Sequence, residues 1–212
     1  MKRAILTGFE PFGPYAFNPT QDIAREFHGR RVDGVEVRGF VLPCTYYGAF
    51  ELLHEEMQRL SPDIVLSTGL ASRVLALRIE TVGKNIMHSK YPDAEGRHSC
   101  GEPLLFHGKP RYRTNTDGIA LVNFLSDLGI PADVSEDAEG FVCNSLIYLT
   151  AKEIHEESLP IAHAFFHTPW TDAYTGKVQL EEGKIVIPQY RLRKTVEGLL
   201  GFLSLDKYTR KL

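Results

Sequence analysis

The sequence predicts an α/β fold in which helices alternate with strands of a parallel sheet. Short apolar runs at residues 4–7 and 64–69, the second of which ends in glycine, are typical of buried parallel strands. Segments with a polar cap and apolar residues at helical spacing separate such runs. The repeated order of strand, helix and strand is the signature of α/β proteins.

The first half of the chain supplies clear element boundaries. Asn18 followed by Pro19 indicates an N-cap and a proline at the first helical position, so we expect a helix up to Phe27. A strand follows at 35–42, then a helix that begins at Thr45 or a neighbour and ends at Leu60, and an extended segment from 75 that ends near Glu80.

The second half opens with a polar segment rich in proline and glycine, residues 84–113, where we expect loops and short strands. Beyond it, Thr116 and Asp117 can cap a helix that Gly129 and Pro131 close. The remaining predicted elements are a short strand near 133–135, a helix from the Cys143 region to about 158, a strand at 161–167 and a last helix at 188–203.

Length and composition limit the function classes. The 212 residues suit one domain, residues 1–212, and the net charge of -3 leaves no basic stripe for nucleic acid or an anionic membrane surface. The apolar segment 4–6 is too short for a signal peptide or a membrane span, so we expect a cytoplasmic protein. Three scattered cysteines predict reduced thiols, with no disulfide framework.

Cys143 lies where a helix is predicted to begin, directly after a small, acidic loop. The unpaired N–H groups and the dipole of a helix N-terminus stabilise a thiolate, so we expect the pKa of Cys143 to be lowered. The same N–H groups could bind an oxyanion. The alternative is a buried structural cysteine, since free cysteines are among the most buried residues.

Glu80 and His167 fall near the ends of predicted strands, and ligands of open α/β sheets bind beyond those ends. A cysteine, a histidine and a carboxylate can therefore meet there as nucleophile, base and orienting acid. His163 lies four residues before His167, which could suggest a metal pair. Because the segment is predicted to be a strand, we expect no metal and interpret His163 as a hydrogen-bonded structural histidine.

Four segments together resemble the pyroglutamyl peptidase I, or pyrrolidone-carboxylate peptidase, family. They are Thr7-Gly8-Phe9-Glu10-Pro11-Phe12-Gly13 with Asn18-Pro19, Glu80-Thr81-Val82-Gly83-Lys84-Asn85-Ile86, Gly140-Phe141-Val142-Cys143-Asn144 and Phe166-His167-Thr168-Pro169. The resemblance implies a three-layer α/β/α sandwich with a mostly parallel, twisted sheet, no cofactor and a homo-oligomer, dimer or tetramer. It assigns the catalytic triad to Glu80, Cys143 and His167.

The resemblance also implies the substrate, a peptide whose N-terminal residue is pyroglutamate. This residue is a neutral lactam without a free amine, so shape and hydrogen bonds must recognise it. Phe9 and Phe12 are candidate apolar plates around the ring, although aromatic residues in loops often only fill the core. Asn18 is a third candidate, which we expect to cap its helix rather than to touch substrate. The implied reaction proceeds through a thioester acyl-enzyme.

Two other functions fit the same fold class. A nucleoside-phosphorylase-like transferase is one, but the sequence has no glycine-rich phosphate loop. A catalytically impaired, pyroglutamyl-binding relative is the other, and titration of Cys143 would separate it from the enzyme.

The chain departs from the family pattern at three places. It has Leu70-Ala71-Ser72-Arg73-Val74 where a Gly-Arg turn is usual, and Lys90 where an arginine is common. Its glycine before the cysteine segment also comes one place late, in Ala138-Glu139-Gly140. We expect these changes to affect turnover, fine specificity and loop geometry rather than the triad.

Overall fold

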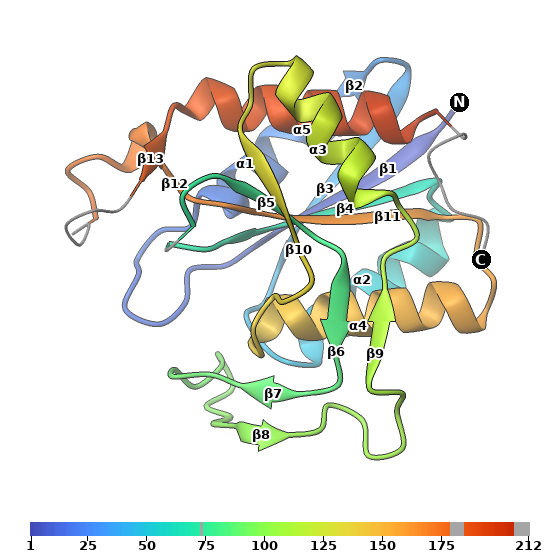
Figure 1. Ribbon diagram of the computed structural model, residues 1–212, viewed down its shortest axis with the longest axis vertical. Helices are drawn as coiled ribbons and strands as arrows, with labels where there is room; N and C mark the ends of the chain where they lie inside the picture. Colours follow the sequence, from blue (N-terminus) through green and yellow to red (C-terminus); the bar gives the residue numbers. More distant parts are fainter. Residues whose placement is uncertain (73, 179–184, 206–212) are drawn as a thin grey trace.

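The protein is a three-layer sandwich with a seven-stranded sheet between two layers of helices (Figure 1). The computed structural model describes residues 1–72, 74–178 and 185–205. In spatial order the strands are β10 (Ala132–Ser135), β5 (Leu77–Glu80), β11 (Ala162–Thr168), β4 (Ile64–Leu70), β1 (Arg3–Phe9), β3 (Val35–Leu42) and β2 (Arg31–Val32). The helices are α1 (Pro19–Phe27), α2 (Gly48–Leu60), α3 (Gly118–Asp127), α4 (Val142–Glu156) and α5 (Gln189–Leu203). The predicted fold class is confirmed.

The direction of the strands divides the sheet into two parts. Strands β3, β1, β4 and β11 are parallel to one another, whereas β5 runs antiparallel to β11 and β10 runs parallel to β5. The short edge strand β2 pairs antiparallel with β3. The sheet is thus mostly parallel, with a reversal between β11 and β5.

Each face of the sheet has its own hydrophobic core. Alternate residues of β4 point to opposite faces, so Ile64 and Leu66 pack under α1, α3 and α5, while Val65 packs under α2 and α4 (Figure 1). All seven residues of β4 are buried. Burial on both faces explains why the sequence of this strand is almost continuously apolar.

The helix boundaries follow the predicted caps. Asn18 accepts a hydrogen bond from Thr20 N–H before α1, and Asp117 accepts two from the N–H groups of Ile119 and Ala120 before α3. Helix α2 begins at Gly48, later than expected. The backbone N–H of Tyr46 donates to the buried carboxylate of Asp93, which holds this segment outside the helix.

The polar segment 84–113 forms an arm beside α4, as Figure 1 shows. It begins at the last residue of β6 (Val82–Lys84), which pairs with β9 (Arg111–Arg113), and it contains β7 (Met87–His88) paired with β8 (Cys100–Glu102). These elements confirm the expected loops and short strands. The remaining elements are β12 (Trp170–Thr171), the 3₁₀ turn η1 (Asp172–Tyr174) and β13 (Val186–Ile187). In the described ranges, no helix has the length and apolar character needed to cross a membrane.

His163 is buried in β11, and neither ring nitrogen has a hydrogen-bond partner among the described residues. The expectation of a structural histidine is therefore confirmed, but its expected hydrogen bonds are absent there. Burial lowers the pKa of His163 from 6.5 to about 3, and the charge of His155 adds to the effect. The folded protein must keep this imidazole neutral.

This burial predicts a loss of stability in acid. Between pH 6.5 and about 3 the unfolded chain binds a proton at His163 that the folded chain does not, so stability falls as the pH drops below 6.5. The contribution is about 1.4 kcal/mol for each pH unit in that window. Urea unfolding at pH 7 and pH 5 measures it: His163→Leu should show a smaller difference than wild type. An equal difference in the two proteins would contradict the assignment.

Candidate active site

A histidine–carboxylate pair lies where β11 meets β5. Nδ1 of His167 is 2.8 Å from Oε1 of Glu80, and both side chains are buried. In the antiparallel register Phe165 stands opposite Glu80, so His167, two residues further along β11, is the diagonal neighbour of Glu80 on the same face. Since a carboxylate only accepts hydrogen bonds, Nδ1 carries the proton and Nε2 is left as an acceptor.

Cys143 reaches the same place from the other side, as the second residue of α4. Its Sγ and the Cδ2 of His167, which is bonded to Nε2, lie 2.7 Å and 3.1 Å from the position that a Cβ on Gly69 would occupy. The thiol and the Nε2 side of the imidazole therefore meet above Gly69, a residue that must be glycine because a side chain would collide with both. The three sequence-predicted triad residues are thus brought together.

The helix N-terminus at Cys143 is open. No side chain caps α4 in the described part of the chain, where its N-cap residue is Phe141. The N–H groups of a first helical turn have no partner within the helix, so here they can bind an anionic oxygen. The prediction that Cys143 begins a helix is confirmed.

The predicted lowering of the Cys143 pKa is wrong for the substrate-free site. Burial raises the pKa of this thiol well above its ordinary value, and Cys44, Glu80 and Glu139 raise it further. A backbone N–H bond opposes these effects only in part. Sequence shows the helix start but not how tightly the sulfur is enclosed. The resting thiol is therefore neutral, and its proton must leave during the reaction.

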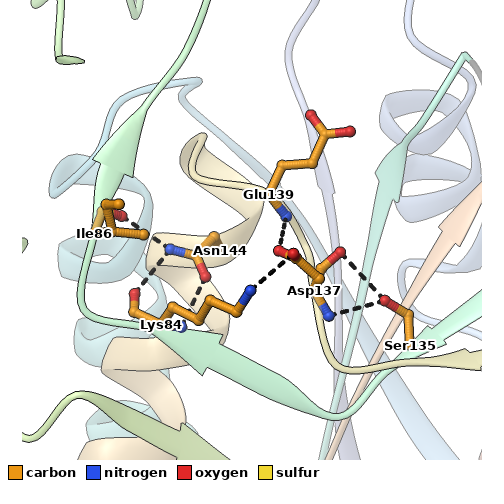
Figure 2. Close-up of polar contacts among 6 residues, drawn as sticks. All are labelled: Lys84, Ile86, Ser135, Asp137, Glu139 and Asn144. Carbon is orange, nitrogen blue, oxygen red and sulfur yellow. Dashed lines mark hydrogen bonds and ion pairs between the residues drawn. The ribbon is translucent and has the colours of Figure 1, made fainter. Parts of the chain in front are cut away.

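The loop before Cys143, residues 135–141, is ordered around Asp137, as Figure 2 shows. One oxygen of this carboxylate accepts the backbone N–H of Glu139 at 3.0 Å, and the other lies 2.8 Å from the ammonium of Lys84. Ser135 adds a hydrogen bond from the N–H of Asp137 to its hydroxyl at 3.0 Å. We call residues 135–141 the Cys143 loop.

The departure from the family pattern in this loop has a structural reason. Glu139 takes the left-handed backbone conformation, with φ +62°, which most residues other than glycine avoid. Gly140 does not have a positive φ, but a Cβ there would lie 2.9 Å from the backbone N of His88. His88 N–H donates to the carbonyl of Gly140 at 2.8 Å. The glycine is needed for this close contact, and the unusual φ falls on Glu139.

The exposed carboxylate of Glu139 is one of the charges that raise the pKa of Cys143. We therefore expect Glu139→Gln to lower that pKa, so that iodoacetamide alkylates Cys143 faster than in wild type at the same pH. Mass spectrometry of the alkylated peptides distinguishes Cys143 from the exposed Cys100. Glu136→Gln is the matched control, because Glu136 pairs with Arg113 and is not one of the charges acting on Cys143. An unchanged rate in Glu139→Gln would contradict the prediction.

Aromatic rings lie beside the thiol. Phe12 is half-buried, with its ring centroid 5.9 Å from that of Phe141 and 5.7 Å from that of Tyr15. Phe141 packs in turn on Tyr46 at 5.6 Å. Sequence analysis missed Phe141 as a candidate, although its place two residues before Cys143 was a usable signal. Phe9 is only 2% exposed and belongs to the core below α4, so it lies deeper than Phe12.

Asn18 is buried and bonded on both sides of its amide. Its Oδ1 accepts from the N–H and hydroxyl of Thr20, and its Nδ2 donates to the carbonyl of Glu10 at 3.0 Å. The capping role is confirmed, and the second bond ties the loop that carries Phe12 to helix α1. Contact of Asn18 with substrate stays a prediction.

The arm packs against the Phe12 loop. A Cβ on Gly13 would lie 3.4 Å from the ring of Tyr91, and the ammonium of Lys90 lies 5.7 Å from the centre of that ring. At the other departure from the family pattern, Arg73 lies outside the described residues. Over the described ranges, no three histidine, cysteine or acidic side chains are grouped so that they could hold a metal ion.

A thiol beside a carboxylate-bound imidazole, at the start of a helix in an α/β/α sandwich, is the arrangement used by cysteine hydrolases. A family model described as pyroglutamyl peptidase matches residues 2–201. The chain belongs to the pyroglutamyl peptidase family, a family of cysteine peptidases.

Individual relatives agree with this assignment. The pyrrolidone-carboxylate peptidase of Pyrococcus furiosus is 32% identical over 168 residues, 79% of this chain and 81% of the relative, and that of Chromobacterium violaceum is 35% identical over 70% of each chain. The solved structure of the pyrrolidone carboxyl peptidase from Thermococcus litoralis superimposes with a TM-score of 0.90 at 28% identity, covering 100% of this chain and 98% of that one. These matches support the peptidase and not the nucleoside-phosphorylase-like alternative.

Proposed function

We propose that the chain is a cysteine exopeptidase that removes N-terminal pyroglutamyl (5-oxoprolyl) residues from peptides. The observation that carries the proposal is the convergence of Cys143 and His167 above Gly69, with Nδ1 of His167 held by Glu80. A buried carboxylate behind the ring keeps Nε2 free to accept the thiol proton. Family membership supports the choice of substrate.

The proposed reaction has two steps. In the first, the proton of Cys143 moves to Nε2 of His167 while the sulfur attacks the pyroglutamyl carbonyl, and first-turn N–H groups of α4 bind the oxyanion. The C–N bond then breaks, His167 gives the proton to the leaving amine, and a thioester remains. In the second step His167 takes a proton from a water molecule, whose oxygen attacks the thioester carbonyl. The C–S bond then breaks, pyroglutamate is released, and His167 returns the proton to the sulfur. Glu80 stabilises the imidazolium in both steps.

Recognition of the lactam rests on shape and hydrogen bonds, and the aromatic side chains supply the shape. Phe12 and Phe141 are proposed as the apolar plates around the ring, with Phe9 below them and Asn18 fixing the loop that carries Phe12. A pyroglutamyl ring is uncharged, so a carboxylate to grip an N-terminal ammonium is not required. No cofactor enters this mechanism.

Hydrolysis of fluorogenic amides tests the proposal. Purified, reduced protein should release the fluorophore from a pyroglutamyl amide and not from a prolyl amide, which has the same ring size but a charged amine and no lactam carbonyl. No release from the pyroglutamyl amide by folded protein would overturn the proposal. Binding of pyroglutamate without turnover would instead favour the impaired relative.

We also propose that residues 1–212 act as one domain, in the cytoplasm and as a homo-oligomer, dimer or tetramer. The free thiols of Cys44, Cys100 and Cys143 support a reducing compartment. Exposed apolar side chains such as Leu75 and Phe106, 71% and 89% exposed, support self-association. Light scattering of the purified protein gives its mass: a monomer at micromolar concentration would contradict the oligomer.

A further inference from the structure

Lys84 joins the chain before Cys143 to the chain after it. Its backbone N–H donates to Oδ1 of Asn144 at 2.8 Å, and its carbonyl accepts from Nδ2 of Asn144 at 2.9 Å. Nδ2 of Asn144 also donates to the carbonyl of Ile86 at 3.0 Å. Asn144 is fully buried and directly follows the nucleophile, so β6 fixes the first turn of α4 through main-chain contacts.

The side chain of Lys84 contacts the segment that precedes Cys143. Figure 2 shows its ammonium pointing to Asp137, with Nζ 2.8 Å from Oδ2. The two ends of the Cys143 loop are held independently of this pair, Ser135 by Thr81, which precedes β6, and Gly140 by His88 of the arm. Between these ends, two ion pairs join the loop to the arm in the described structure, Arg113 with Glu136 and Lys84 with Asp137. The second pair is the one bonded to Glu139, because Asp137 also accepts the N–H of Glu139.

We propose that the Lys84–Asp137 ion pair is a latch on the Cys143 loop and that Lys84 is a positioning residue for the reaction. The latch keeps Glu139 in its left-handed conformation and so fixes the direction in which the chain enters α4 and presents its first-turn N–H groups. An oxyanion hole depends on donors that are already in place before the reaction. The inference rests on the proposed function for its effect on turnover, but the latch itself is a property of the loop.

The solvent exposure of the ion pair determines how much activity its loss should cost. The side chains of Lys84 and Asp137 are 38% and 63% exposed, so the pair is a surface ion pair. Such pairs contribute little to stability and are screened by salt. Breaking the latch should therefore lower kcat about two- to five-fold without unfolding the protein, and the difference from wild type should shrink in 1 M NaCl. KM should change less than kcat, because neither Lys84 nor Asp137 is among the residues proposed to hold the lactam ring.

The experiment compares Lys84→Met, Asp137→Asn, the double variant and Lys84→Arg. The two single variants should each lower kcat, the double variant should be no worse than either, and Lys84→Arg should restore most of the activity. Lys152→Met is the matched control. It breaks the Lys152–Glu156 ion pair, which lies on helix α4 at the end far from Cys143. Unchanged kcat in Lys84→Met, or losses that add in the double variant, would overturn the latch.

Hydrogen exchange separates this inference from the proposed function. Backbone amides of residues 137–141 should exchange faster in Lys84→Met than in wild type, and at the wild-type rate in Lys152→Met. If wild type does not hydrolyse the pyroglutamyl amide, the proposed function fails while exchange still tests the latch. Equal exchange in Lys84→Met and wild type would overturn the latch even in an active enzyme.

Discussion

Cys143→Ala is expected to remove pyroglutamyl amidase activity, by about 10⁴–10⁶-fold, because the proposed acyl-enzyme forms on the Cys143 sulfur. Sγ is the atom that stands above Gly69 next to the imidazole, and alanine leaves only a Cβ at this position. The measurement is kcat/KM on the fluorogenic pyroglutamyl amide. The fold should survive, since the substitution removes a single heavy atom from a residue that is only partly buried as a whole.

The control for this prediction is the exposed thiol of Cys100, which lies on β8 of the arm. Cys100→Ser should keep wild-type kcat/KM and should remain sensitive to iodoacetamide, whereas Cys143→Ala loses the activity outright. Substantial turnover by folded Cys143→Ala would mean that Cys143 is not the nucleophile.

His167→Asn is expected to lower kcat by about 10²–10⁴-fold, the usual range for loss of a general base. The effect should be severe here because burial raises the pKa of Cys143, so the thiol does not ionise readily without an acceptor for its proton. Raising the pH should therefore recover part of the activity of this variant, as hydroxide replaces the imidazole. Rate measurements from pH 6 to pH 10 follow this recovery.

Two further variants serve as comparisons for His167→Asn. Glu80→Gln keeps a hydrogen-bonding group beside Nδ1 of His167 but removes the charge, so its loss should be smaller than that of His167→Asn. His98→Asn alters an exposed histidine of the arm and should leave kcat unchanged. If His167→Asn lost no more than His98→Asn, the general-base role would be refuted.

The secondary structure was largely predictable because local signals mark it. Asn18 with Pro19 and Asp117 are side-chain caps, and each begins its helix in the structure where it was expected. The apolar run of β4 reflects burial on both faces, which sequence also reveals. The direction of β5 could not be predicted, because strand reversal depends on which neighbour the strand pairs with and leaves no mark in its own four residues.

At the site, sequence predicted which residues meet but not their surroundings. Cys143, His167 and Glu80 converge as expected, yet the pKa of the thiol shifts in the opposite direction, because enclosure by distant segments outweighs the helix terminus. The same limit applies to His163, because the lack of a partner for its ring among the residues that the structure describes depends on what packs around β11. Lys84 and Asp137 are far apart in sequence, so nothing local suggested their contact.

The register between β5 and β11 has a consequence for how the site tolerates change. Glu80 and His167 stand on the paired strands β5 and β11, neither of which is an edge strand of the sheet, whereas Cys143 follows the loop 135–141. Inserting one residue within β5 would turn Glu80 to the opposite face of the sheet. The Glu80–His167 pair therefore cannot change position unless the pairing of β5 with β11 changes as well. The position of Cys143 can be altered by changes in residues 135–141, without any change in the sheet. Variation among related enzymes should therefore concentrate in the approach to the cysteine, and the histidine–carboxylate pair should be the part that persists.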